Sequence, residues 1–348
     1  MLPFADSVTW GVGGAIAALA LFMLLHLFSR AFTRTRQQKQ TAVDNAFLRL
    51  LQAGISADDF LAAARKPSRR YARRAVLHAF RSLGETFREF LTYTYDQLGF
   101  CAQAIRDCGS GSWTTRAEGV LELGAFRKGE AIPHALTLLN DTHVEVRIAA
   151  ARALSDIGAP GTIRPILDAI PVCTRWAISD AVDLIRPFGE SAGPELLQVL
   201  RDSTTLQARL AAVEAIGEIA YRDAFKVIEP LLGDQEVDLR AAATRALGRL
   251  GGHGLYPALG RALKDPAWQV RAVAARQLGS YRGPEAVALL EVALGDPAWW
   301  VRVNAAEALR LQEAQGADSF RKMSASPDKF ASDLAAQMLE ALEGRSIA

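Results

Sequence analysis

The sequence predicts an all-α protein, a right-handed α–α superhelix of stacked helix pairs preceded by a single transmembrane helix. Two observations predict this fold: an uncharged apolar stretch near the N-terminus, and a sequence pattern, called the line below, that recurs seven times. The chain has 348 residues, 50% apolar and 22% charged, with 27 Gly, 14 Pro and three Cys. This composition is typical of a folded protein and excludes disordered, collagen-like and disulfide-scaffold chains.

The apolar stretch covers residues 10–28, which carry no formal charge and are interrupted only by His26. A helix needs about 20 predominantly apolar residues to cross the hydrocarbon core of a membrane. A cleaved signal peptide carries positive charges before its apolar stretch, whereas the only charge before this one is Asp6. Residues 9–29 are therefore predicted to form an uncleaved transmembrane anchor rather than a signal peptide or a buried core helix.

Basic residues follow the anchor at Arg30, Arg34, Arg36 and Lys39. Because basic residues mark the cytoplasmic end of a membrane helix, residues 1–8 are expected outside the cytoplasm. Residues 30–41 are interpreted as a basic juxtamembrane linker. The expected localisation is the inner (cytoplasmic) membrane, single-pass, with the N-terminus out and the solenoid in the cytoplasm.

Residues 42–111 show helical periodicity but do not match the recurring line, and we interpret them as divergent helical hairpins. They contain six cations within ten residues. Near an anionic membrane surface each such cation contributes about 1 kcal/mol. This basic helix is thus a candidate for contact with the membrane surface or an acidic partner, while an ordinary solvated helix face remains the alternative. The six cations are Arg65, Lys66, Arg69, Arg70, Arg73 and Arg74.

The recurring line is centred on an arginine that opens an Ala-rich helix, as in DTHVEVRIAAARALSDIG from Asp141. Successive arginines are 31, 28, 34, 31, 31 and 31 residues apart. A shorter apolar segment precedes each one, so a unit of about 31 residues holds two antiparallel helices. Such a pair cannot bury its apolar face alone, and the seven units over residues 112–313 must therefore stack. The arginines are Arg116, Arg147, Arg175, Arg209, Arg240, Arg271 and Arg302.

An apolar residue stands three positions before each arginine, as at Trp113, Trp268 and Trp299. Residues three apart share a helix face. We therefore expect the apolar residue to enter the core while the guanidinium reaches out of it.

The line D-x-x-x-x-V-R-x-x-A-A-x-A-L-G resembles the HEAT repeat, in the short bacterial form also found in phycobilin lyases. In that family the Asp and Arg of successive repeats form a ladder between neighbouring units. Exposed ion pairs contribute about 0 to 1 kcal/mol each, so the ladder is expected to set the stacking register, and its residues to be structural rather than catalytic. The resemblance implies that the ladder consists of Asp141, Arg147, Asp234, Arg240, Asp265, Arg271, Asp296 and Arg302.

Two departures from the line carry predictions of their own. The third copy, around Arg175, is displaced by three residues, which predicts a local bend in the superhelix. After Leu309 the pattern decays, and Ser332 stands where an arginine is expected. Residues 314–348 are therefore interpreted as a C-terminal cap.

Motifs for catalysis are absent from the sequence: there is no Walker A, H-E-x-x-H, G-x-S-x-G or paired C-x-x-C. The five histidines lie at no metal-ligand spacing, and no His-Glu dipeptide of the kind used by HEAT-repeat hydroxylases occurs. Residues 112–348 carry a net charge of −4, unlike the basic groove of HEAT-like DNA glycosylases. The sequence predicts no catalytic, cofactor or metal residue, no small-molecule substrate and no nucleic acid partner.

The expected function is a non-enzymatic, membrane-anchored scaffold that binds a protein along a concave face lined by the second helices. The position five after each repeat arginine supports this expectation, because a mostly charged column inside an Ala-rich helix must face solvent. Its first position is Leu121. Its charged positions are Arg152, Asp180, Glu214, Arg245, Arg276 and Glu307.

The layout also resembles bacterial HEAT proteins that accompany membrane glycosyltransferases of surface-polysaccharide pathways, which implies a membrane-associated partner. Two alternatives stay open. One is a phycobilin-lyase-like or chromophore-handling enzyme on the same scaffold. The other is nucleic-acid binding through the six-cation cluster.

Overall fold

The computed structural model describes residues 37–49, 51, 57–65, 67–83, 87–169 and 178–345, and these residues form helices and turns without strands. They fall into two compact units, Met1–Arg106 and Asp107–Ala348. The predicted transmembrane segment, residues 9–29, lies outside the described residues. Within the described ranges, no helix combines the length and the apolar character that crossing a membrane requires.

The first unit contains a helix over residues 37–49, α2 (Ala57–Arg65), α3 (Arg69–Leu83) and α4 (Arg88–Gln97), and α5 (Phe100–Cys108) crosses into the second unit. Its core is aromatic, since the Phe60 ring meets those of Phe47 and Phe90 edge-on, with 5.1 Å between centroids in both pairs. The helix that starts at residue 37 includes the last five residues of the predicted linker.

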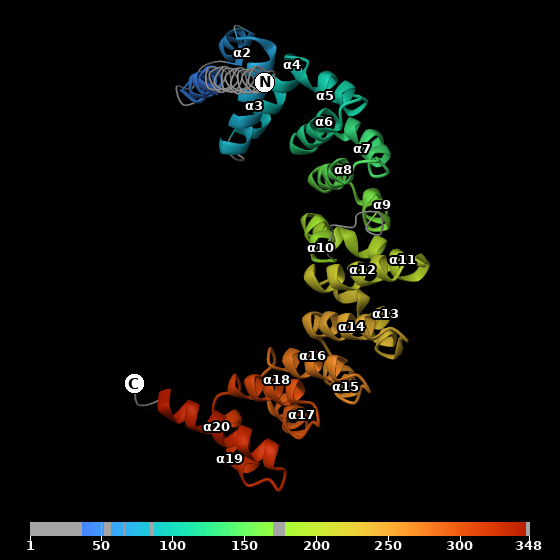
Figure 1. Cartoon of the computed structure of the whole chain (residues 1–348), viewed down its shortest axis with the longest axis vertical. Coiled ribbons are helices and arrows are strands. Elements are labelled where there is room, and N and C mark those ends of the chain that lie inside the picture. Colours follow the sequence, from blue (N-terminus) through green and yellow to red (C-terminus); the bar gives the residue numbers. More distant parts are fainter. Residues whose placement is uncertain are drawn as a thin grey trace, which may run out of the picture. The chain divides into compact units, whose positions relative to one another are not determined.

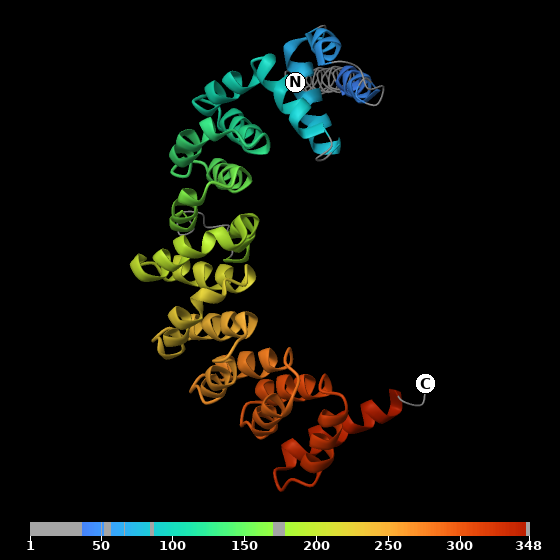
Figure 2. The ribbon, with the colours of Figure 1, turned by 180° about the vertical axis from the view of Figure 1, so that it is seen from behind.

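The second unit is an all-helical solenoid, in which α6 stacks on α8, and α12, α14, α16 and α18 follow one another in contact. Figures 1 and 2 show these second helices in one layer and the shorter first helices in another. The second helices are α6 (Trp113–Ala125), α8 (Val144–Ile157), α10 (Ile178–Ile185), α12 (Leu206–Glu218), α14 (Val237–Leu250), α16 (Trp268–Leu278) and α18 (Trp299–Arg310). The first helices are α7 (Ile132–Leu138), α9 (Ile163–Asp168), α11 (Gly193–Asp202), α13 (Phe225–Ile228), α15 (Leu255–Ala262) and α17 (Pro284–Leu294).

Small residues let the second helices approach closely. A Cβ atom added at Gly124 in α6 would lie 2.5 Å from the Cα of Ala153 in α8. At the equivalent Gly217 in α12, the added atom would lie 3.0 Å from the Cα of Ala246 in α14. Both alanines are fully buried. The Ala-rich line of the sequence therefore serves helix-to-helix packing between units.

The two irregular regions differ in how much of them is described. The displaced third copy includes residues 170–177, which lie outside the described residues, so the predicted bend stays a prediction. The C-terminal region forms a hairpin of α19 (Ala314–Ser324) and α20 (Lys329–Arg345) that packs on α18. Ser332 lies in the first turn of α20.

Candidate functional site

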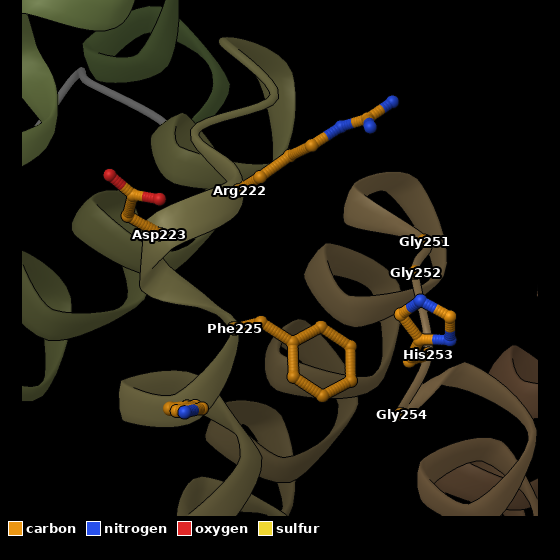
Figure 3. A pocket seen from close by; sticks show the side chains of 8 residues that line it. Arg222, Asp223, Phe225, Gly251, Gly252, His253 and Gly254 are labelled. Atoms are coloured by element: carbon orange, nitrogen blue, oxygen red, sulfur yellow. The ribbon is translucent and has the colours of Figure 1, made fainter.

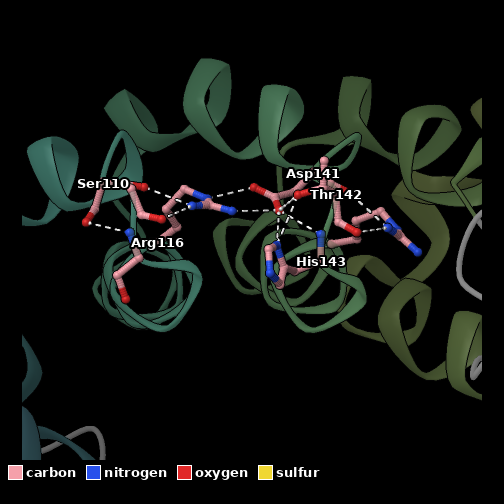
Figure 4. Close-up of polar contacts among 8 residues, drawn as sticks. Ser110, Arg116, Asp141, Thr142 and His143 are labelled. Carbon is pink, nitrogen blue, oxygen red and sulfur yellow. Dashed lines mark hydrogen bonds and ion pairs between the residues drawn. The ribbon is translucent and has the colours of Figure 1, made fainter.

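The ladder begins with Arg116 of α6, which lies between Ser110 and Asp141 (Figure 4). Its Nε donates to Oδ2 of Asp141 at 2.7 Å and its Nη2 to Oδ1 at 2.9 Å. Its Nη1 donates to the carbonyl oxygen of Ser110 at 2.9 Å. The hydrogen bonds from Arg116 outweigh burial and hold the pKa of Asp141 at about 2. Arg116 thus joins its own unit to the next one.

The same bond recurs between later units. Arg240 donates to Asp265 at 2.7 and 3.0 Å, and its Nη1 donates to the carbonyl oxygen of Asp234 at 2.9 Å. Arg240 and Arg271 therefore each bind the side chain of the aspartate 25 residues ahead and the backbone carbonyl of the aspartate six residues behind. The other described side-chain bonds of this kind are Arg209 to Asp234 at 2.8 Å and Arg271 to Asp296 at 2.7 and 2.8 Å.

The aspartates also fix the turns that start the second helices. Oδ1 of Asp265 accepts the backbone N–H of Ala267 at 2.8 Å, and Asp296 and Ala298 repeat this contact at the same distance. Burial alone would raise the pKa of Asp265, but the hydrogen bonds from Arg240 and Ala267 outweigh it, and the pKa is lowered. The carboxylate stays ionised, and both of its oxygens accept hydrogen bonds from the arginine of the preceding unit or from the following turn. These residues therefore hold neighbouring units together.

Two ladder arginines have different surroundings. The Nη1 of Arg147 donates to the Asp141 carbonyl oxygen at 2.8 Å, and the residue 25 positions ahead of it is outside the described residues. Arg302 donates to the Asp296 carbonyl oxygen at 2.8 Å, and its guanidinium lies 5.1 Å from the centroid of the Phe330 ring. The ladder thus ends on an aromatic ring of α20.

The expected orientation of the arginine and the apolar residue before it is wrong. Arg240 and Arg302 are 9% and 7% exposed, whereas Trp113, Trp268 and Trp299 are 40%, 41% and 55% exposed. The tryptophan is the first residue of its helix and sits at the open rim of the turn. The donors of Arg240, one turn later, are satisfied by the Asp265 side chain of the next unit and by backbone carbonyls of its own unit.

The charged column lies on the second helices, but its members are not equally available. Arg245 forms an ion pair with Glu214 of the preceding second helix, and Arg249 reaches Glu218 at 2.8 Å. Burial raises the pKa of Glu214 even though Arg245 and Arg249 oppose the shift. Arg245 and Glu214 therefore neutralise each other across two units.

The remaining column positions are more exposed. Glu307 is exposed and pairs with Arg310 one turn away at 2.9 Å. Asp180 is also exposed. Arg152 and Arg276 are exposed and form no ion pair with any residue that the structure describes. Two arginines of the column, Arg152 in α8 and Arg276 in α16, therefore carry charge that no described residue pairs, and they are four repeat units apart. Leu121 is half-buried.

The family model for HEAT repeats matches residues 101–184, 193–267 and 256–340. The chain belongs to the HEAT-repeat family. The matched residues start at 101, within the predicted divergent hairpins, and end at 340, within α20. A search of curated proteins finds no match.

One solved structure supports the fold, and two others align with the chain at lower TM-scores. A mutant of Kap121p aligns with 87% of this chain and 41% of its own, at 14% identity and a TM-score of 0.54. The complex of CpcE and CpcF of phycocyanin lyase from Nostoc sp. aligns with 70% of this chain and 94% of that chain, at 19% identity and a TM-score of 0.32. Human deoxyhypusine hydroxylase aligns with 86% of this chain and 98% of its own, at 17% identity and a TM-score of 0.28.

The six-cation cluster does not form one helix. Arg65 ends α2, Pro67 and Ser68 separate it from α3, and Lys66 is outside the described residues. Arg69 is exposed, and its guanidinium donates to the Gly99 carbonyl oxygen at 3.0 Å and lies 5.1 Å from the centroid of the Phe100 ring. Arg73 is half-buried, while Arg65, Arg70 and Arg74 are exposed. The prediction of a single basic helix is therefore wrong. Arg69 and Arg73 also interact with other residues of the chain.

An open cavity of about 480 Å³ lies between two HEAT units, beside the loop that precedes α15 (Figure 3). It is lined by Arg222, Asp223, Phe225, Lys226 and the loop residues Gly251, Gly252, His253 and Gly254. The side chains of Arg222 and Asp223 point in different directions, and the Phe225 ring packs against Gly254. In the part of the chain with described coordinates, no three His, Cys, Asp or Glu side chains could hold a metal ion.

Sequence reasoning missed one further surface group, four exposed aromatic side chains at the starts of consecutive second helices. Trp268, Trp299 and Trp300 are 41%, 55% and 54% exposed, and Phe330 in α20 is 70% exposed. The signal that could have found them is the D-P-A-W sequence that opens both α16 and α18, because a first-turn residue sits at the rim of the stack.

Proposed function

We propose that this protein is a non-enzymatic scaffold, anchored in the inner membrane by residues 9–29, whose cytoplasmic HEAT solenoid binds a partner protein across its second helices. One observation carries the proposal: Arg152 and Arg276 are exposed on the second-helix layer without an ion partner among the described residues, while the ladder charges of the same layer are paired within the chain. Uncompensated charge on an ordered surface governs partner choice and association rate.

The HEAT fold supports this function because stacked helix pairs create an extended surface on which partners bind. Both the match to the HEAT-repeat family and the similarity in fold to Kap121p lie in the solenoid, which is the part of the chain proposed to bind the partner. We further propose that the partner is a membrane glycosyltransferase of a surface-polysaccharide pathway, since an anchor followed by HEAT repeats resembles proteins of that kind. An anchored scaffold restricts its partner search to the membrane surface.

The test is quantitative co-purification of the full chain from native membranes in mild detergent. The variant R152E/R276E reverses both free charges, and R201E/R222E makes the same charge change on α11 and on the turn before α13, outside the second-helix layer. Surface substitutions change stability by about 0.5 kcal/mol or less, so both variants should fold. We expect the glycosyltransferase with the wild type and with R201E/R222E, and its loss from R152E/R276E. Equal retention by all three proteins would refute the proposed binding surface.

A further inference from the structure

The four exposed aromatic residues form one surface, which we call the aromatic patch: Trp268, Trp299, Trp300 and Phe330. They come from the first turns of α16, α18 and α20, and α18 contacts both α16 and α20. An aromatic side chain contributes roughly 150–250 Å² when fully buried. At the observed exposures the patch offers roughly 300–550 Å² of ring surface, the size of the largest patch on a typical monomer and one that is often functional.

Three of the four rings of the patch have contacts within the chain that hold them in place before any partner arrives. Trp299 and Trp300 meet edge-on, with 4.5 Å between centroids. Phe330 lies over the guanidinium of Arg302, which is fixed by its bonds to the carbonyl oxygens of Asp296 and Pro297 at 2.8 and 3.1 Å. A preorganised ring loses little conformational entropy on binding, and Trp and Arg are the residues most enriched among binding hot spots.

The charges beside the patch select the kind of partner. Trp300 and Glu307 are seven residues apart on α18, so both lie on one helix face, and Glu307 is neutralised by Arg310. Arg276 occupies the position of Glu307 in α16 and remains exposed without an ion pair to the described residues. The uncompensated charge on this face of α16 and α18 is therefore positive.

The distance between the two recognition elements follows from helix geometry. Seven residues of rise along α18 correspond to about 10 Å, and neighbouring helix axes lie about 8–10 Å apart. Trp300 and Arg276 are therefore about 14 Å apart across the face.

We propose that the aromatic patch and Arg276 bind an amphipathic segment of the partner protein that presents an apolar side chain and a carboxylate about 14 Å apart. The apolar side chain covers Trp300 and its neighbouring rings, and the carboxylate meets Arg276. This inference rests on the proposed scaffold function and names the chemistry of the partner at one end of the second-helix layer.

The experiment places the photo-crosslinking amino acid p-benzoylphenylalanine at position 304 of the full chain in native membranes, one turn after Trp300 on α18, so that Trp300 and Arg276 are both kept. The cross-linked peptide is identified by mass spectrometry. We expect a peptide of the co-purifying partner that contains apolar residues and an Asp or Glu. A cross-link to a second copy of this chain, a cross-link to lipid, or no cross-link would each overturn the proposal.

Substitutions then test the two contacts separately. W300A should weaken retention of the cross-linked partner roughly thirtyfold, as expected for a hot-spot side chain, and R276E should do the same. A Lys in place of the partner's identified carboxylate should restore binding to R276E. W113A is the control, because Trp113 also lies in the first turn of a second helix, α6, and is 40% exposed, but it lies outside the aromatic patch.

A second probe separates this inference from the proposed function. The same photo-crosslinker placed at position 152, in α8, reports partner binding at the other end of the layer. Cross-links from position 152 alone overturn the aromatic-patch inference and leave the scaffold function standing. Cross-links from neither position refute both.

Discussion

Removing the guanidinium of Arg240 tests whether the ladder stabilises the solenoid. Arg240 is 9% exposed and Asp265 is 8% exposed. In R240A the Asp265 carboxylate loses the donors at 2.7 and 3.0 Å and keeps the backbone N–H of Ala267. A buried polar group left without its partner costs about 1–3 kcal/mol. Loss of a solvent-exposed ion pair would lower stability by less than about 1 kcal/mol. Because Arg240 and Asp265 are both buried, we expect the larger loss of stability.

The assay is urea unfolding of the full chain in mild detergent, followed by helical circular dichroism. R240A should lower the unfolding midpoint, and the double variant R240A/D265A should reveal a coupling energy of at least about 0.5 kcal/mol. R276A is the control, because Arg276 is exposed in the next second helix and should change stability by less than about 0.5 kcal/mol. The reasoning is refuted if R240A unfolds at the midpoint of R276A, or if the coupling energy is zero.

Three further predictions concern packing, acid stability and topology. Gly124→Ala should destabilise the protein by about 1–3 kcal/mol, because the new Cβ would lie 2.5 Å from the Cα of Ala153. Gly129 has open space around it, so Gly129→Ala should not destabilise the protein, and the urea unfolding midpoints of the two variants test this difference. The Asp141 pKa is about 2, lowered from 3.8, so its stabilisation is present above about pH 4 and is lost as the pH falls toward 2; thermal melts of Asp141→Asn should show a flatter acid dependence, and an unchanged one contradicts this. A reporter active only in the periplasm, fused after Ala348, should stay silent, and activity there would refute the cytoplasmic solenoid.

The solenoid could be predicted because its information is local and periodic. An arginine about every 31 residues, in four of the seven units an aspartate six positions before it, and a short apolar segment upstream define a unit whatever its neighbours are. The structure adds that Arg240 bonds to Asp265, the aspartate of the following unit, and to the backbone of its own. Sequence spacing alone does not distinguish these two bonding partners.

The burial of individual side chains could not be predicted in the same way. A pair such as Trp268 and Arg271 fits a helix with either member inside, and hydrophobicity favours the tryptophan. In the structure Arg271 is the more buried of the two. Its guanidinium donates to Asp296 and to the carbonyl oxygen of Asp265, with bonds of 2.7 to 2.9 Å. Once a charge is fully hydrogen-bonded, its burial is tolerated, and the first-turn tryptophan is left at the rim.

The sequence also could not rank the charged positions five residues after each arginine, for a related reason. Helical periodicity places Glu214, Arg245 and Arg276 on one face, but it does not show that Glu214 and Arg245 neutralise each other across two units. A partner that binds Arg245 must first break that ion pair, whereas Arg276 has no such contact with the described residues. The structure therefore separates two arginines that the sequence treats as equivalent. It predicts that R276E weakens partner retention strongly, while R245E acts mainly by placing a second carboxylate beside Glu214, which should appear as a lowered urea midpoint before any change in binding.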